Sequence, residues 1–156
     1  MRIERRAGLG VLALTLAAFL PSLRGSFVWD DVALIERNPA MRSGTGFVEI
    51  ATRDLWGQAT GATTQLYHPL PMLSIWAQTQ LFGVELVPLR LFNVALHLLC
   101  VWCFVQLLLR LAVPSRWSWL AGLVVAVHPS VCEPVMWITG RHDTLGMLLL
   151  MAAMLS

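Results

Sequence analysis

The sequence predicts an all-α integral membrane protein with about three to four transmembrane helices. Its 156 residues are 57% hydrophobic and only 13% charged, with a mean hydropathy of +0.68, whereas about 25% of the residues in a soluble domain are charged. The hydrophobic residues gather in long runs that alternate with polar connections. The formal net charge of +2 gives no reason to expect a nucleic-acid partner, so the lipid bilayer is the expected surrounding.

The first transmembrane helix is expected over about residues 7–23. Arg2, Arg5 and Arg6 precede this apolar run, which is also the pattern of a signal peptide. We favour an uncleaved helix because the segment 21–24 reads Pro-Ser-Leu-Arg and lacks the small residues of a cleavage site. The positive-inside rule then places the N-terminus in the cytoplasm.

A long outer section follows over residues 24–86. Within it, residues 70–82 carry apolar side chains at helical spacing with serine and glutamine between them, which predicts an amphipathic helix. This helix lies either in the membrane interface, where tryptophan is favoured, or against the helical bundle. The sequence leaves both alternatives open.

The rest of the chain alternates between membrane helices and short connections. Residues 88–111 predict the second transmembrane helix. Residues 117–128 predict the third, which is short for a span, so it either continues past His128 or is supported by its neighbours. An outer loop covers residues 128–143, and residues 144–156 begin a fourth helix that stops within an apolar run, so we expect a fragment. Both polar sections then face the non-cytoplasmic side.

Polar side chains near the membrane are costly and therefore mark candidate sites. Asp30 and Asp31 follow the first helix, where adjacent carboxyls suit a general base or a cation site. For this pair alone, a solvated turn with a helix cap is the preferred interpretation. Tyr67 and His68 precede Pro69 at the start of the amphipathic helix. They face a headgroup or a substrate, or they serve only the helix start.

The second outer loop is the richest cluster. Residues 128–143 contain two histidines, two acids, an arginine and a tryptophan. Arg141 offers a planar fork that suits phosphate, while His128 and Glu133 suit a metal, an acceptor or each other. A solvated connection rarely needs this mixture, so a functional role is favoured. Asn93, inside the second helix, either bonds across helices or belongs to the site.

Four segments in this order resemble a known family: FVWDDVALIERNP, YHPLPMLSIW followed by LFG, LRLFNVALHLL, and AVHPSVCEPVMWITGRHDTL. Together they resemble the N-terminal part of the transmembrane and tetratricopeptide-repeat O-mannosyltransferases and of their bacterial GT-C glycosyltransferase relatives. The resemblance extends from Phe27 over nearly all of the remaining chain. It implies the N-terminal part of a GT-C fold, without the later membrane helices and the repeats.

The resemblance implies an inverting hexosyltransferase. Such an enzyme transfers a sugar, mannose or a similar one, from a polyprenyl-phosphate donor to a hydroxyl of a protein or glycan acceptor. The reaction takes place on the periplasmic or luminal side, and a bacterial inner membrane is the preferred location.

The resemblance also assigns roles to individual residues. It implies that Asp30 is the catalytic base with Asp31 as its partner, and that Arg141 binds the lipid phosphate. The second loop matches the family at His128, Pro129, Glu133, Gly140, Arg141 and Asp143. The first loop departs from it, because His68 stands where the family more often has arginine.

Alternatives to this function remain open. No cofactor is predicted, and a divalent cation at the acids is an unsupported alternative. A non-catalytic membrane module or truncated paralogue is the second hypothesis. A transporter fragment is the third, although transporters place their polar residues near the midplane of the bilayer and this chain places them at its outer edge.

Overall fold

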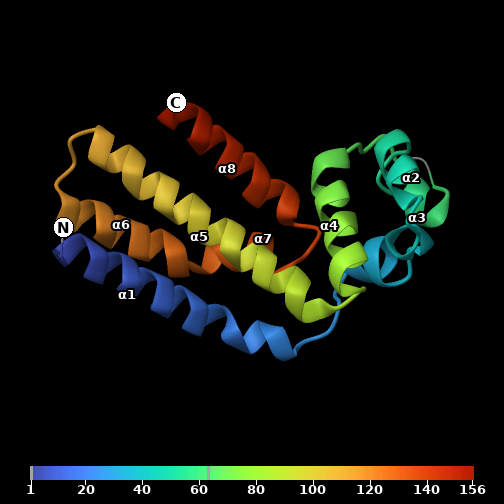
Figure 1. The fold of residues 1–156 in the computed structure, drawn as a ribbon, viewed down its shortest axis with the longest axis horizontal. Helices are drawn as coiled ribbons and strands as arrows, with labels where there is room; N and C mark the ends of the chain where they lie inside the picture. Colours follow the sequence, from blue (N-terminus) through green and yellow to red (C-terminus); the bar gives the residue numbers. More distant parts are fainter. Residues whose placement is uncertain (1, 63) are drawn as a thin grey trace.

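Four helices form the main bundle of the protein. The computed structural model describes residues 2–62 and 64–156, and in helix α1 it describes side chains from residue 7 onward. The bundle consists of α1 (Arg2–Phe19), α5 (Leu86–Arg110), α6 (Ser115–Val127) and α8 (Arg141–Leu155). Helix α5 is central because it packs against the other three (Figure 1). The described residues form no strand, so the predicted all-α class is confirmed.

Two segments are long and apolar enough to cross a membrane. They are Ala7–Arg24, which combines most of α1 with the 3-10 turn η1 (Leu20–Arg24), and α5. A third candidate arises if α6 and Pro129–Met136 are one bent span, with an angle of 55° between them. Helix α8 has 15 residues, fewer than the about 20 that a span requires. An all-α membrane protein with two or three candidate spans is therefore established.

The bend after α6 coincides with a proline. Pro129 begins the 3-10 turn η4 (Pro129–Val131), and α7 (Cys132–Met136) follows directly. Proline lacks a backbone N–H group and cannot continue the α-helical ladder of the preceding turn. Helix α6 therefore ends at Val127, and the chain continues past it in a new direction as η4 and α7. That these segments form a single span stays a prediction.

The outer section between α1 and α5 is folded on itself. Besides α4 (Pro69–Phe82), which the sequence predicts, it contains four short elements that the sequence analysis does not predict. These are a π-helical turn η2 (Val32–Glu36), the 3-10 turn η3 (Pro39–Arg42), α2 (Gly46–Thr52) and α3 (Gly57–Thr60). Leu34, Ile35, Met41, Ile50, Met72 and Ile75 form their buried core, joined by Leu89 of α5 and Ile138 of the second outer loop. The first outer section (residues 24–86) and the second (residues 128–143) therefore share one core.

Helix α4 packs on this outer section. The indole Nε1 of Trp76 donates to the carbonyl of Ser43 at 3.0 Å, and the Thr79 hydroxyl donates to the carbonyl of Met41 at 2.7 Å. The same helix also contacts α5 and α8. Packing against the protein, the second of the two alternatives, is therefore observed. The apolar side chains of Leu70, Leu81 and Phe82 are exposed, so the interfacial position of this helix stays a prediction.

Candidate functional site

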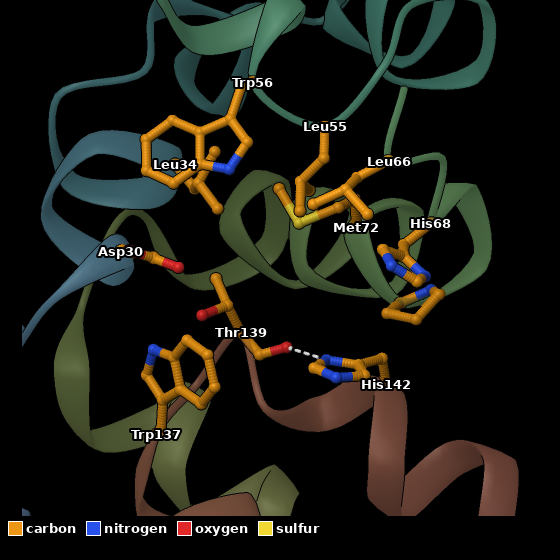
Figure 2. Close-up of a pocket in the computed structure, with 11 residues that line it drawn as sticks. Asp30, Leu34, Leu55, Trp56, Leu66, His68, Met72, Trp137, Thr139 and His142 are labelled. Carbon is orange, nitrogen blue, oxygen red and sulfur yellow. Dashed lines mark hydrogen bonds between the residues drawn. The ribbon is translucent and has the colours of Figure 1, made fainter. Parts of the chain in front are cut away.

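A cavity of about 160 Å³ lies where the two outer sections meet (Figure 2). Its polar lining comes from Asp30, His68, Thr139 and His142. The apolar lining consists of Leu34, Leu55, Trp56, Leu66, Pro71, Met72 and Trp137. A carboxylate and two imidazoles from three distant parts of the sequence thus share one mostly apolar cavity.

A tight turn sends the two adjacent acids to different places. The amide of Asp31 donates to the carbonyl of Val28 at 3.0 Å, so Trp29 and Asp30 form the corner of the turn. Trp29 adopts the left-handed region with φ of 49°, a conformation that costs a bulky residue roughly 1–3 kcal/mol. Asp30, at the corner, is half-buried and lines the cavity, whereas Asp31 leads into the interior.

Asp31 joins the first outer section to the second. Its side chain is fully buried, and its two carboxylate oxygens accept hydrogen bonds from the amides of Ile138 at 3.0 Å and Thr139 at 2.9 Å. Burial raises the pKa of Asp31, and the hydrogen bonds from the Thr139 and Ile138 backbone oppose this shift. Asp31 therefore holds the segment that supplies Trp137, Thr139 and His142 to the cavity.

Arg141 is fully buried and does not line the cavity. Its Nε donates to Asn93 Oδ1 at 2.7 Å, and its terminal nitrogens donate to Ser74 Oγ at 3.1 Å, to Gln78 Oε1 at 3.0 Å and to the carbonyl of Leu89 at 3.1 Å. Its guanidinium also lies 4.7 Å from the centre of the Phe92 ring. Burial lowers the pKa of Arg141 to about 9, which leaves it protonated at neutral pH. In this structure Arg141 ties the start of α8 to α4 and α5.

The two histidines of the cavity contact each other. The rings of His68 and His142 stack with centroids 5.3 Å apart and an interplanar angle of 27°. Nδ1 of His142 lies 2.8 Å from the carbonyl of Thr139, so this nitrogen is the donor. Nε2 of His142 is 3.5 Å from Asp143 Oδ1. Figure 2 shows both rings toward the right of the view, with His68 close to Leu66 and Met72, and Asp30 on the opposite side of the cavity.

Aromatic rings continue from the histidine pair toward the turn that carries Trp29 and Asp30. Trp137 meets His142 edge to face at 6.3 Å between centroids. Trp29, which is 71% exposed, meets Trp137 in the same manner at 5.9 Å. Trp29, Trp137, His142 and His68 thus form a continuous row of rings beside Asp30.

The remaining residues that the sequence singled out lie outside the cavity lining. The hydroxyl of Tyr67 donates to the carbonyl of Ala51. His128 is exposed and accepts a hydrogen bond from the Ser130 amide at 3.2 Å, which caps η4. Glu133 is exposed in the first turn of α7, and Asp143 is exposed beside His142. Of the predicted residues, the structure brings Asp30 and His68 together.

Sequence reasoning did not select His142, Trp137 or Thr139 as site residues. For His142 a signal exists, because consecutive residues of a helix point about 100° apart. If Arg141 faces the interior, its neighbour must face another direction. Trp137 counts toward the polar and aromatic mixture of residues 128–143, whereas for Thr139 we find no local signal.

Residues 2–62 and 64–156 contain no group of three or more His, Cys, Asp or Glu side chains arranged to hold a metal ion. The prediction about cofactors stays a prediction.

The comparisons with known proteins give one consistent result. No protein-family model and no solved structure matches the chain. Protein O-mannosyl-transferase TMTC1 of Mus musculus is 36% identical over 139 residues, which is 86% of this chain and 15% of that protein. Tmtc1 of Drosophila melanogaster is 33% identical over 141 residues (88% and 16%), and TMTC2 of Homo sapiens is 32% identical over 133 residues (84% and 16%).

The chain spans about a sixth of the length of these three relatives. The matches cover at least 84% of the chain. By this similarity the chain belongs to the TMTC family of protein O-mannosyl-transferases.

Proposed function

We propose that the chain contributes the acidic half of the active site of a membrane mannosyltransferase. The enzyme transfers mannose from a polyprenyl-phosphate donor to a hydroxyl of a protein on the non-cytoplasmic side. The names of the relatives support the mannosyl transfer. The cavity between the two outer sections, lined by Asp30, supports the location of the chemistry.

The observation that carries this proposal is the difference between the two adjacent acids. Asp31 is fully buried and both of its oxygens accept backbone hydrogen bonds. Asp30 is half-buried and opens into the cavity. Only Asp30 is therefore free to reach a substrate hydroxyl.

The chemistry suits a carboxylate at this position. In an inverting transfer, the acceptor oxygen forms a bond to the anomeric carbon while the bond from that carbon to the phosphate oxygen breaks. Asp30 takes the proton of the attacking hydroxyl as general base, and the phosphate leaves with the electron pair of the broken bond. The exposed ring of Trp29 and the half-buried ring of Trp137 offer apolar faces to the C–H groups of a sugar.

The test is Asp30→Asn in membranes that contain the complete protein. Transfer of labelled mannose from polyprenyl-phosphate mannose to protein should fall by about 10²–10⁴-fold, the usual contribution of a general base. The amount of protein in the membrane fraction should not change, because Asp30 has no role in the buried core. Glu49→Gln removes an exposed acid of α2 outside the cavity and is the matched control.

Undiminished transfer by Asp30→Asn would exclude Asp30 as the base. A wild-type protein that inserts normally and transfers no sugar would instead favour a non-catalytic membrane module.

A further inference from the structure

We propose that His68 and His142 together form the cationic site for the departing phosphate of the donor, and that this site operates by taking up a proton. The inference rests on the proposed function, because it assigns the leaving-group side of the same cavity. Departure of a phosphate leaves negative charge on its oxygen, and hydrogen-bond donors or cations placed at that point stabilise it.

The lining of the cavity shows which side chains can supply a positive charge to the phosphate. The sequence contains 11 basic residues besides its histidines, all of them arginines, and no arginine lines this cavity. Arg141, which directly precedes His142, is fully buried and donates to four acceptors inside the protein. Among the residues that line the cavity, only His68 and His142 can carry positive charge.

The geometry of the pair suits an anion. The rings are stacked at 5.3 Å and are both half-buried, so two imidazoles present their edges to the same space. The hydrogen bond from His142 Nδ1 to the carbonyl of Thr139 at 2.8 Å fixes the orientation of that ring. Two protonated rings repel each other at this distance, and an anion beside both of them offsets this repulsion.

Two acids face the pair. Asp143 Oδ1 lies 3.5 Å from Nε2 of His142. Asp30 lines the same cavity, and its carboxylate repels an incoming phosphate. Phosphate binding therefore requires the imidazoles to be protonated.

The reaction balances with this assignment. The proton of the acceptor hydroxyl goes to Asp30, and the electron pair of the broken bond goes to the phosphate oxygen. The imidazolium donates a hydrogen bond to that oxygen and need not transfer its proton. No oxidant or further reactant is required.

The inference predicts a characteristic pH dependence of binding. Imidazole gains its charge near neutral pH, so the pair loses its charge as the pH rises. A phosphate monoester becomes more negative above about pH 6, which alone would strengthen its binding to a permanent cation. Binding that weakens with rising pH is therefore attributable to the protein.

The experiment measures binding of undecaprenyl phosphate to the purified complete protein at pH 6.0 and pH 8.5 by calorimetry. We expect the wild type to bind about tenfold or more tightly at pH 6.0, the effect of one charge-assisted hydrogen bond. His68→Gln and His142→Gln should each weaken binding at pH 6.0 and reduce this difference. His68→Arg supplies a permanent charge, so it should bind at both pH values.

Controls separate the site from other effects. Arg53→Gln removes an exposed cation of the same outer section outside the cavity and should leave binding unchanged. Inorganic phosphate tests whether the headgroup alone suffices, and undecaprenol, which lacks phosphate, should show no pH dependence. Thermal unfolding of each variant verifies that it is folded.

The outcomes separate this inference from the proposed function. Wild-type binding that does not depend on pH, or no binding at either pH by a folded protein, would overturn the histidine site even if mannose transfer is intact. So would unaltered binding by both glutamine variants. Conversely, pH-dependent binding together with full transfer by Asp30→Asn would support the histidine site and reject Asp30 as the base.

Discussion

Asp30 and Asp31 differ in environment because of one turn. Asp31 accepts two backbone hydrogen bonds in the interior, and we predict that Asp31→Asn weakens this junction. An asparagine amide presents an N–H group to one of the two backbone amides, so one buried donor loses its acceptor, at a cost of about 1–3 kcal/mol. Hydrogen exchange at the amides of Ile138 and Thr139 should accelerate about tenfold or more.

Asp54→Asn is a suitable comparison for this measurement. Asp54 also accepts from two backbone amides, those of Gly57 at 2.6 Å and Thr64 at 3.1 Å, and the Gly57 bond is the main cause that lowers its pKa. It lies in another part of the first outer section, so its substitution should not alter exchange at Ile138. Equal exchange in wild type and Asp31→Asn would show that the carboxylate does not hold the second loop.

Sequence reasoning at the residue scale identified the acidic pair and could not divide it. The different positions of Asp30 and Asp31 depend on the left-handed conformation of Trp29. A tryptophan does not predict this conformation, because glycine is the residue usually found there. Likewise, tertiary packing around α8 determines that Arg141 is buried and that the adjacent His142 lines the cavity.

At the scale of elements, Arg141 anchors the beginning of α8 to the rest of the bundle. We predict that Arg141→Lys destabilises the protein, because an ammonium on a flexible stem cannot reach acceptors on α4 and α5 at the same time. For Arg141→Ala, a loss of about 1–3 kcal/mol is expected for each buried acceptor left unpaired, and these include the side-chain oxygens of Asn93 and Gln78. The yield of monodisperse protein in size-exclusion chromatography, followed by thermal unfolding, measures both effects.

Arg116→Ala is the control for this series. Arg116 is exposed, with its guanidinium 5.5 Å from the centre of the Trp117 ring, so its removal should leave the unfolding temperature unchanged. A stable Arg141→Ala protein with weaker donor binding as its sole defect would instead assign Arg141 to the phosphate, as the family resemblance implies.

Helices with a strong periodic or apolar pattern were predictable from the sequence. The predicted ranges 70–82, 88–111 and 117–128 end within two residues of α4, α5 and α6. The short elements of the outer section were not predictable in this way. Helices α2 and α3 have seven and four residues, too few to be stable alone, so they depend on the core to which Leu34 and Ile50 belong.

At the scale of the whole molecule, the two outer sections lie together, away from the N-terminus and the turn between α5 and α6 (Figure 1). Ile138 of the second section is buried in the core of the first. Arg90 donates to the carbonyl of Ser26 at 2.7 Å in the first section and to that of Met136 at 3.2 Å in the second. The hydropathy pattern indicated only that both sections are polar connections, and their shared core could not be derived from it.

This arrangement predicts the outcome of a topology experiment with thiol reagents. Cys132, in α7, is exposed, whereas Cys100 and Cys103 are buried in α5, so a membrane-impermeant maleimide added to the non-cytoplasmic side should label Cys132 and leave Cys100 and Cys103 unmodified. In a Cys132→Ser background, Gly44→Cys should be labelled from the same side, because a Cβ at Gly44 meets no atom within 4 Å. Arg116→Cys, at the opposite end, should be labelled only after permeabilisation.

The reason for this outcome is the shared core of the outer sections. A bilayer between Gly44 and Cys132 would have to separate Ile138 from Leu34, and Arg90 could no longer donate to the carbonyls of both Ser26 and Met136. Labelling of the two positions from opposite sides would therefore contradict the packing of the outer sections. It would also remove the cavity between them, and with it the meeting of Asp30, His68 and His142 on which the proposed chemistry depends.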